Sequence, residues 1–269
     1  MDVLQAIVLG IIQGATEFIP VSSSGHLVLV PWLLGWDSPG LVYDTVVHWG
    51  TLVAVVVFFR RDWWALISAW LRGLVHWDWS DPEARLAWFL VLGTIPAAVI
   101  GFLLEDFFES LFGQPAWVSF FLLVTAGLLA ASEWLGSRLR KVQDLRWPDA
   151  LLVGLGQAAA IAPGISRSGA TMAAGLLRGL ERPAAARFSF LLSTPIIFGA
   201  GLLQLVDLFG APDAMAQLPA LVVGFAAAAI SGYLAIWGLL RYLQRGRLYP
   251  FAIYCTLAGS AGLLIALIR

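Results

Sequence analysis

Two polar stretches decide the fold of this chain: QGATEFIPVSSSGH at residues 13–26 and PGISRSGAT at residues 163–171. The apolar segments that precede them, 3–12 and 150–162, are too short to cross a bilayer, because a transmembrane helix needs about 20 apolar residues. Each polar stretch is followed by a second short apolar segment, at 27–35 and at 170–180. This pattern predicts two re-entrant hairpins, in which one helix enters the membrane and a second helix returns.

The composition also indicates a membrane protein. Hydrophobic residues make up 60% of the 269 residues and charged residues only 12%, whereas soluble domains have roughly 45–50% and roughly 25%. Such a chain has too little polar surface for a soluble or disordered protein. A net charge of −1 gives no reason to expect nucleic acid as a partner. Cys255 is the single cysteine, which excludes an internal disulfide and a thiolate metal cluster.

Six further apolar segments are long enough to cross the membrane. They lie near residues 42–60, 84–104, 116–136, 187–206, 217–241 and 249–268. The sequence therefore predicts an all-α polytopic membrane protein with six transmembrane helices and two hairpins.

Basic residues gather in alternate connections between these spans. All except Arg167 and Arg269 lie within residues 60–85, 138–146, 178–187 and 241–247. The other connections, 30–41, 105–115 and 207–216, carry acidic residues and no cations. Because cationic loops stay in the cytoplasm, we expect both termini on the outer, periplasmic side. The first hairpin would then enter from outside and the second from inside.

The two hairpins are copies of each other at a shift of 144 residues. The matching pairs are Gly10 and Gly154, Gln13 and Gln157, Ser22 and Ser166, Ser24 and Ser168, Gly25 and Gly169, and Gly35 and Gly179. Each repeat comprises a hairpin and three spans, and this odd number inverts the second copy. We predict one membrane domain over 1–269, built from inverted repeats at about 1–136 and 145–269, with a site where the two helix breaks meet.

The first break carries groups suited to nucleophilic chemistry. A charged side chain in an apolar segment costs about 3 kcal/mol on insertion scales, so Glu17 is a functional candidate. Gln13 lies four residues earlier and shares its helix face. Ser22 is placed to cap the next helix, and Ser23 and His26 could supply a nucleophile and a base. The alternative is that the serines only cap the helix and His26 bonds to a carbonyl.

The second break has the composition of an anion-binding site. The Arg167 guanidinium can bind two phosphate oxygens at once. Helix-start amides and the hydroxyls of Ser166, Ser168 and Thr171 add donors. The alternative is a structural salt bridge between Arg167 and Glu17.

Asp44 and His48 lie four residues apart near the outer end of the first span. They could pair with each other or support the site from outside it.

At the two polar stretches the chain resembles the undecaprenyl-diphosphate phosphatases, also called bacitracin-resistance phosphatases, and the resemblance covers nearly the whole length. It implies removal of the terminal phosphate of undecaprenyl diphosphate, which regenerates the lipid carrier for peptidoglycan and other envelope polymers and confers bacitracin resistance. It also implies a multi-pass inner-membrane protein of inverted-repeat architecture. Its active site would face the periplasm and use a divalent cation, Mg²⁺ or Ca²⁺.

The resemblance and the residue chemistry together give a candidate site. The catalytic residues would be Glu17, Ser23, His26 and Arg167, with Glu17 also a metal ligand. The substrate-binding residues would be Gln13, Ser22, Ser24, Ser166, Ser168, Gly169 and Thr171. Many family members have a glutamate at the position of Gln13, and the amide here supplies no charge.

Several alternatives stay open at the level of sequence. Ser23 would attack with His26 as base, or His26 would itself be the nucleophile. Inverted repeats alone would favour a transporter or lipid flippase, whereas a structural scaffold would leave Glu17 and Arg167 without a role. We expect undecaprenyl diphosphate and membrane lipid as partners and leave a homodimer open.

Overall fold

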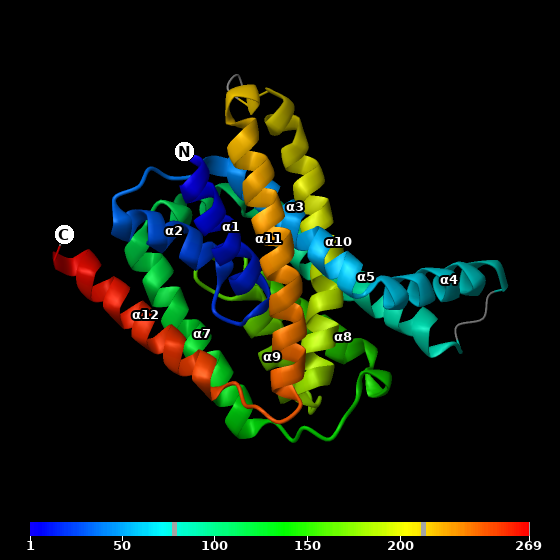
Figure 1. The fold of residues 1–269 in the computed structure, drawn as a ribbon. Coiled ribbons are helices and arrows are strands. Elements are labelled where there is room, and N and C mark those ends of the chain that lie inside the picture. The colour runs from blue at the N-terminus through cyan, green and yellow to red at the C-terminus, as the bar shows by residue number, and fades with distance from the viewer. Residues whose placement is uncertain (77–79, 211–213, 269) are drawn as a thin grey trace.

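The protein is mostly helical over the residues that the computed structural model describes, which are 1–76, 80–210 and 214–268 (Figure 1). The helices are α1 (Val3–Phe18), α2 (Ser23–Leu34), α3 (Gly40–Phe58), α4 (Arg60–His76), α5 (Pro82–Leu103), α6 (Glu105–Phe112), α7 (Pro115–Leu135), α8 (Trp147–Ala159), α9 (Arg167–Leu177), α10 (Arg182–Gly210), α11 (Ala214–Leu243) and α12 (Tyr249–Ile268). A short 3₁₀ helix, η1, covers Val142–Asp144. The prediction of an all-α protein is confirmed.

Six helices in the described part of the chain are long and apolar enough to cross a membrane. They are α3, α5, α7, the Arg182–Gln204 part of α10, the Gln217–Leu243 part of α11, and α12. These segments correspond to the six predicted spans, so the prediction of a polytopic membrane protein is confirmed. Part of the predicted outer connection 207–216 lies outside the described residues.

Two helices, α4 and α6, occupy segments that the sequence analysis treated only as connections between spans. Their apolar residues recur at helical spacing, which favours an amphipathic helix. Both also carry charged residues in the first turn, Asp62 in α4 and Glu105 and Asp106 in α6. A search for long apolar segments passes over such helices because polar residues alternate with the apolar ones.

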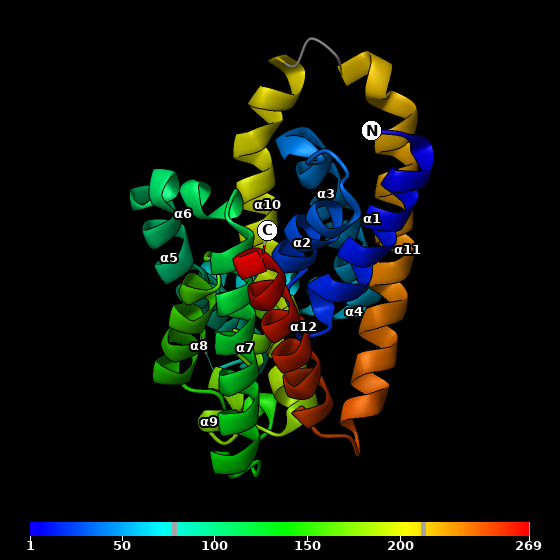
Figure 2. The same cartoon turned by 90° about the vertical axis from the view of Figure 1, so that its left-hand side faces the viewer.

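The two helix–break–helix hairpins are α1–α2 and α8–α9. Figure 2 shows α1 and α2 in the upper half of the molecule and α8 and α9 in the lower half. Their breaks come into contact: the Gly164 amide lies 3.5 Å from Ser24 Oγ, and Ser168 Oγ lies 3.4 Å from the Ile19 carbonyl. The polar groups of both breaks therefore gather in one place.

Equivalent glycines allow each hairpin to approach a long helix closely. α1 packs on α11, where Gly10 faces Gly224, and α8 packs on α5, where Gly154 faces Gly93. Small residues at such crossings let helix backbones come close together, as is common within membranes.

Carboxylates at the basic end of the bundle bind several of the arginines. Glu133 of α7, almost fully buried, accepts hydrogen bonds from Arg138, from Arg182 at the start of α10, and from the Leu248 amide. These bonds join α7, α10 and the segment before α12.

A second carboxylate, Asp149 of α8, pairs with Arg140 at 2.7 Å and with Arg178 at 2.6 Å. Together the two clusters join the end of α7 and the segment after it to α8, to the end of α9 and to the start of α10.

The close packing of α8 on α5 gives a testable prediction. A Cβ added at Gly154 would collide with the carbonyl of Gly93, so Gly154→Ala should destabilise the protein by about 1–3 kcal/mol, as overpacking typically does. Thermal unfolding of the purified protein in detergent measures the effect.

Gly127→Ala is the matched control, because nothing lies within 4 Å of a Cβ added there. This variant should be unchanged or slightly more stable, since alanine is about 1 kcal/mol better than glycine in a helix interior. Equal stability of the two variants would contradict the packing described for α5 and α8.

Candidate active site

Each helix break ends in a serine that caps the helix after it. Ser22 Oγ accepts a hydrogen bond from the Gly25 amide at 3.2 Å, and Ser166 Oγ accepts one from the Gly169 amide at 3.1 Å. These hydroxyls satisfy amides that would otherwise lack a partner at the helix start. The predicted cap at Ser22 is confirmed.

The backbone of Ser22 is strained. Its φ is +72°, in a region of backbone conformation that residues other than glycine rarely adopt. The equivalent Ser166 has an ordinary φ of −70°. Such strain persists only where surrounding structure imposes it and is common at functional sites.

Glu17 lies at the centre of the polar groups and binds both hairpins. Its Oε1 accepts a hydrogen bond from Arg167 Nη2 at 2.9 Å. Its Oε2 accepts one from Ser23 Oγ at 2.5 Å and one from Gln13 Nε2 at 3.0 Å. Because Glu17 is only 5% exposed, its charge depends on these donors.

Two buried polar atoms beside this cluster have no hydrogen-bond partner among the described residues. They are Arg167 Nη1 and Gln13 Oε1. Buried polar groups are nearly always bonded, so an unpaired one suggests a ligand. The free nitrogen of Arg167 suits an anion, and the free oxygen of Gln13 suits a donor or a cation.

His26 lies beside the break but bonds to other groups. Its Nδ1 is 2.7 Å from the Ser22 carbonyl. A carbonyl oxygen can only accept a hydrogen bond, so Nδ1 carries the hydrogen. In the neutral ring, Nε2 then accepts from the Tyr254 hydroxyl at 2.6 Å. Both ring nitrogens are therefore engaged away from Ser23 and Glu17.

The imidazole nearest to Glu17 belongs to His48. Its Nε2 is 3.8 Å from Glu17 Oε2. Its Nδ1 donates to the backbone carbonyl of Asp44 at 2.7 Å. Asp44 and His48 thus contact each other through the backbone, and both face the site.

A cavity of about 640 Å³ opens at this cluster. Its polar end is lined by Glu17, Ser22, Ser23, Ser24 and Arg167. Its apolar wall includes Leu27, Val28, Ile161, Ile165, Ile196 and Ile197. A ligand with a charged head and a hydrocarbon tail matches this arrangement.

The remaining predicted residues do not line the cavity but contact residues that do. Thr171 Oγ1 donates to the Arg167 carbonyl at 2.7 Å and shares a hydrogen bond with Ser189. Ser166 is the buried N-cap of α9, and Ser168 and Gly169 are buried in its first turn. They hold the helix start that carries Arg167.

Three polar residues on helices that line the cavity were missed at the level of sequence: Thr45 on α3, Glu109 on α6 and Gln204 on α10. Thr45 Oγ1 donates to Gln204 Oε1 at 2.7 Å across α3 and α10. Glu109, on α6, appeared in the sequence only as one acidic loop residue. Their spacing in the sequence does not indicate a shared site, because the three residues lie on different helices.

The donor set limits how a divalent cation could bind. The described residues contain no group of three or more His, Cys, Asp or Glu side chains able to hold a metal ion. Glu17 and the unpaired Oε1 of Gln13 nevertheless offer two oxygens beside the cavity. They fit a cation that takes its other ligands from substrate phosphates and water, as Mg²⁺ commonly does.

Comparison with known proteins now identifies the family. Residues 6–261 match the family described as Bacitracin resistance protein BacA. The chain belongs to this family. The BacA match covers all residues of the candidate site and both hairpins except the first residues of α1.

Curated relatives of this BacA-family chain carry the name undecaprenyl-diphosphatase. One from Desulforudis audaxviator is 48% identical over the full length of both chains. One from Rubrobacter xylanophilus is 48% identical over 94% of each chain. A relative from Methanosphaera stadtmanae is 43% identical over 100% of this chain and 99% of its own.

The strained cap gives a prediction for the site. Ser22→Gly loses the cap but suits a φ of +72°, whereas Ser22→Ala loses the cap and keeps the strain. Ser22→Ala should therefore be less stable than Ser22→Gly by about 1 kcal/mol or more. Chemical denaturation of both variants in detergent measures the difference.

Ser166 provides the control, since its φ is ordinary. Ser166→Gly and Ser166→Ala should differ in free energy of unfolding only by the usual difference between these residues at a helix N-cap, a few tenths to about 1 kcal/mol. An equal difference at the two serines would show that Ser22 stores no strain.

Proposed function

We propose that this protein hydrolyses undecaprenyl diphosphate to undecaprenyl phosphate and inorganic phosphate. The observation that carries the proposal is the free Arg167 Nη1 next to the Ser23–Glu17 hydrogen bond, at the polar end of a cavity with an apolar wall. The names of the BacA-family relatives support the same substrate.

The cavity sets the orientation of the substrate. The diphosphate lies at the polar end, where Arg167 binds the oxygens of the terminal phosphate. The isoprenyl chain lies along the apolar wall and continues into the lipid. Phosphoryl transfer depends mainly on positioning and charge neutralisation, and a buried arginine provides both.

Ser23 is the nucleophile in this proposal, and Glu17 is its base. Ser23 Oγ already donates to Glu17 Oε2 at 2.5 Å. As Oγ bonds to the terminal phosphorus, its proton passes to Glu17. The bond from that phosphorus to the bridging oxygen breaks, and undecaprenyl phosphate leaves as an anion.

Water completes the reaction. Glu17 first releases the Ser23 proton to solvent, and it then accepts a proton from the attacking water as the water oxygen bonds to phosphorus. The bond between phosphorus and Ser23 Oγ breaks, and the proton returns to that oxygen. Arg167 holds the phosphate oxygens in both steps.

A bound Mg²⁺ or Ca²⁺ would neutralise charge on the diphosphate. Glu17 and Gln13 Oε1 would hold it together with phosphate oxygens. Gln13 also donates to Glu17 and so orients the carboxylate beside Ser23.

His26 as nucleophile is the alternative mechanism. Its Nε2 faces Tyr254 on α12, and its Nδ1 is held by the Ser22 carbonyl. These contacts favour a positioning role, in which His26 fixes the backbone of the strained Ser22 and so the direction of Ser23.

A transporter would need a second polar site that opens to the opposite face. At the predicted shift of 144 residues, Asp44 and His48 correspond to Phe188 and Leu192, and Glu17 corresponds to Ile161. Phe188 and Leu192 are almost fully buried in the largest apolar core. The asymmetry favours an enzyme with a site on one side over alternating access.

We further propose an inner-membrane location with the cavity facing the periplasm and both termini on that side. This follows from the cationic connections and the cytoplasmic orientation that they favour. In this setting the enzyme recycles the lipid carrier for peptidoglycan and other envelope polymers and contributes to bacitracin resistance. The matching hairpin caps and helix contacts support the inverted repeat and the re-entrant hairpins.

Ser23→Ala tests the nucleophile. It removes the attacking oxygen, so phosphate release from an isoprenyl diphosphate should fall by about 10³-fold or more. The neighbouring Ser24→Ala should lose less than about 10-fold, because Ser24 lines the cavity but supplies neither the attacking oxygen nor the base, and one lost hydrogen bond is worth about 1 kcal/mol. Malachite-green detection of phosphate from purified protein gives both rates.

Rapid acid quenching and peptide mass spectrometry should find phosphate on Ser23 in the unmodified enzyme. Substantial turnover in Ser23→Ala with phosphate on His26 would overturn the serine mechanism. Absence of phosphate release by the unmodified enzyme would overturn the proposed function itself.

Gln13→Glu tests the cation site. A second carboxylate beside Glu17 should lower the Mg²⁺ or Ca²⁺ concentration needed for half-maximal activity by about 10-fold, since ligand charge tunes affinity. Gln157→Glu, the equivalent change in the other repeat, should leave this concentration unchanged. The same cation requirement in both variants would place the metal elsewhere.

A further inference from the structure

Helix α4 projects from the side of the bundle and crosses the direction of α10 and α11 (Figure 1). One stripe of the helix is apolar and exposed: Trp64, Ile67, Leu71, Leu74 and Val75 are 77%, 51%, 50%, 41% and 74% exposed. These residues are spaced by three or four positions and so share one side of the helix. No described part of the chain covers them.

The other sides of α4 differ from this stripe. Leu66, Ala69 and Gly73 are buried, on the side that packs against α5. Arg61 and Arg72 project from the polar side. A helix with an apolar stripe and an arginine-bearing side is typical of helices that lie in the plane of a membrane surface.

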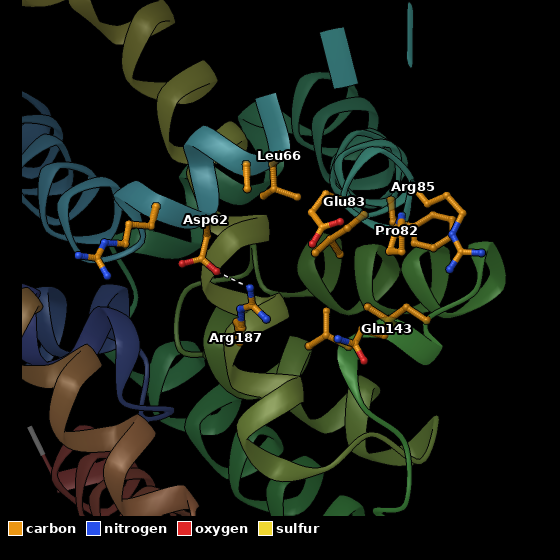
Figure 3. A pocket seen from close by; sticks show the side chains of 13 residues that line it. Asp62, Leu66, Pro82, Glu83, Arg85, Gln143 and Arg187 are labelled. Carbon is orange, nitrogen blue, oxygen red and sulfur yellow. Dashed lines mark hydrogen bonds and ion pairs between the residues drawn. The ribbon is translucent and has the colours of Figure 1, made fainter. Parts of the chain in front are cut away.

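A cavity of about 240 Å³ lies at the foot of α4, between α4, α5, η1 and α10 (Figure 3). Its polar lining comes from Arg61, Asp62, Glu83, Arg85, Gln143 and Arg187. Apolar lining comes from Leu66, Leu86 and Phe89. Figure 3 shows Arg187 directed at Asp62, with Gln143 and Glu83 across the cavity.

The cations of this cavity differ in how they are paired. Arg187 forms an ion pair with Asp62. Arg61 and Arg85 have no ion pair or hydrogen bond with any described residue. Elsewhere at the basic end, Arg138, Arg182, Arg140 and Arg178 are bound to Glu133 and Asp149. Arg61 and Arg85 are therefore available for an external anion.

We propose that this cavity binds the phosphate headgroup of an anionic phospholipid of the cytoplasmic leaflet, whose acyl chains lie along the apolar stripe of α4. Basic pockets beside membrane helices on the cytoplasmic side suit such headgroups, and each arginine near the surface contributes about a five-fold gain in affinity. The apolar stripe of α4 and the unpaired arginines of α4 and α5 all lie within residues 60–85. This is one of the basic segments expected inside the cell.

This site is separate from the substrate cavity. The two cavities share no lining residue. On the predicted orientation they also face opposite leaflets, so the lipid at α4 is not a substrate. Its effect would be to fix α4 at the membrane surface and, through the Asp62–Arg187 pair, to hold the start of α10.

Native mass spectrometry of the purified full-length protein tests the proposal. After incubation with phosphatidylglycerol or phosphatidylcholine at equal concentration, the protein should retain phosphatidylglycerol preferentially. Arg61→Gln with Arg85→Gln should reduce retention of phosphatidylglycerol by about 25-fold, five-fold for each arginine. The control, Arg245→Gln with Arg247→Gln, loses the same charge in another basic connection and should retain it.

A second variant keeps the proposal testable if the double arginine variant does not fold. Ala65→Glu adds a negative charge to the exposed wall of the cavity without removing an interaction. It should reduce retention of phosphatidylglycerol while phosphate release from isoprenyl diphosphate continues, which also separates this site from the proposed active site.

Three results would overturn the proposal. Equal loss of lipid in the two arginine pairs would show general charge attraction. Complete displacement of phosphatidylglycerol by inorganic phosphate at equal concentration would show a site for a soluble anion. Conversion of a dimer to a monomer in the cavity variants, with lipid retention unchanged, would assign the stripe to a second copy of the chain.

Discussion

The buried carboxylate of Glu17 is the group on which the site depends. A charge that is only 5% exposed is tolerated when it is paired and hydrogen-bonded, and removing one partner of such a pair typically costs about 3–5 kcal/mol. Its donors come from α1, from the start of α2 and from the start of α9. The two helix breaks must therefore meet for Glu17 to stay charged. In the proposed mechanism, the contacts that stabilise this meeting point also align Ser23 and Arg167 for phosphoryl transfer.

Much of the fold could be predicted because its signals are local. Six long apolar segments, two short ones and the polar breaks between them follow from the lengths that a bilayer requires. The cap at Ser22 follows from the chemistry of a serine before a helix. Helices α4 and α6 were missed because their stabilisation depends on one packed face, which a search for unbroken apolar segments does not register. Helix α1 continues through Gln13 and Glu17 to Phe18, since polar groups with partners need not end a helix.

Several residues that meet at the helix breaks could be named from the sequence, but their contacts could not. Glu17, Ser23 and Arg167 come together as their motifs suggested. The contacts of His26 and His48 could not be predicted from their positions in the sequence, because their partners come from other helices. His26 bonds to Tyr254, which is 228 residues away, and His48 reaches Glu17 from α3. Spacing along one helix shows which side chains share a face, but not which helix packs against that face.

A structure with orthovanadate, which mimics a phosphoryl group during transfer, tests the central claim most directly. The account predicts vanadium bonded to Ser23 Oγ, with Arg167 Nη1 within hydrogen-bond distance of a vanadate oxygen and Glu17 still beside Ser23. Vanadium bonded to His26, or vanadate bound away from the meeting point of the two helix breaks, would contradict it.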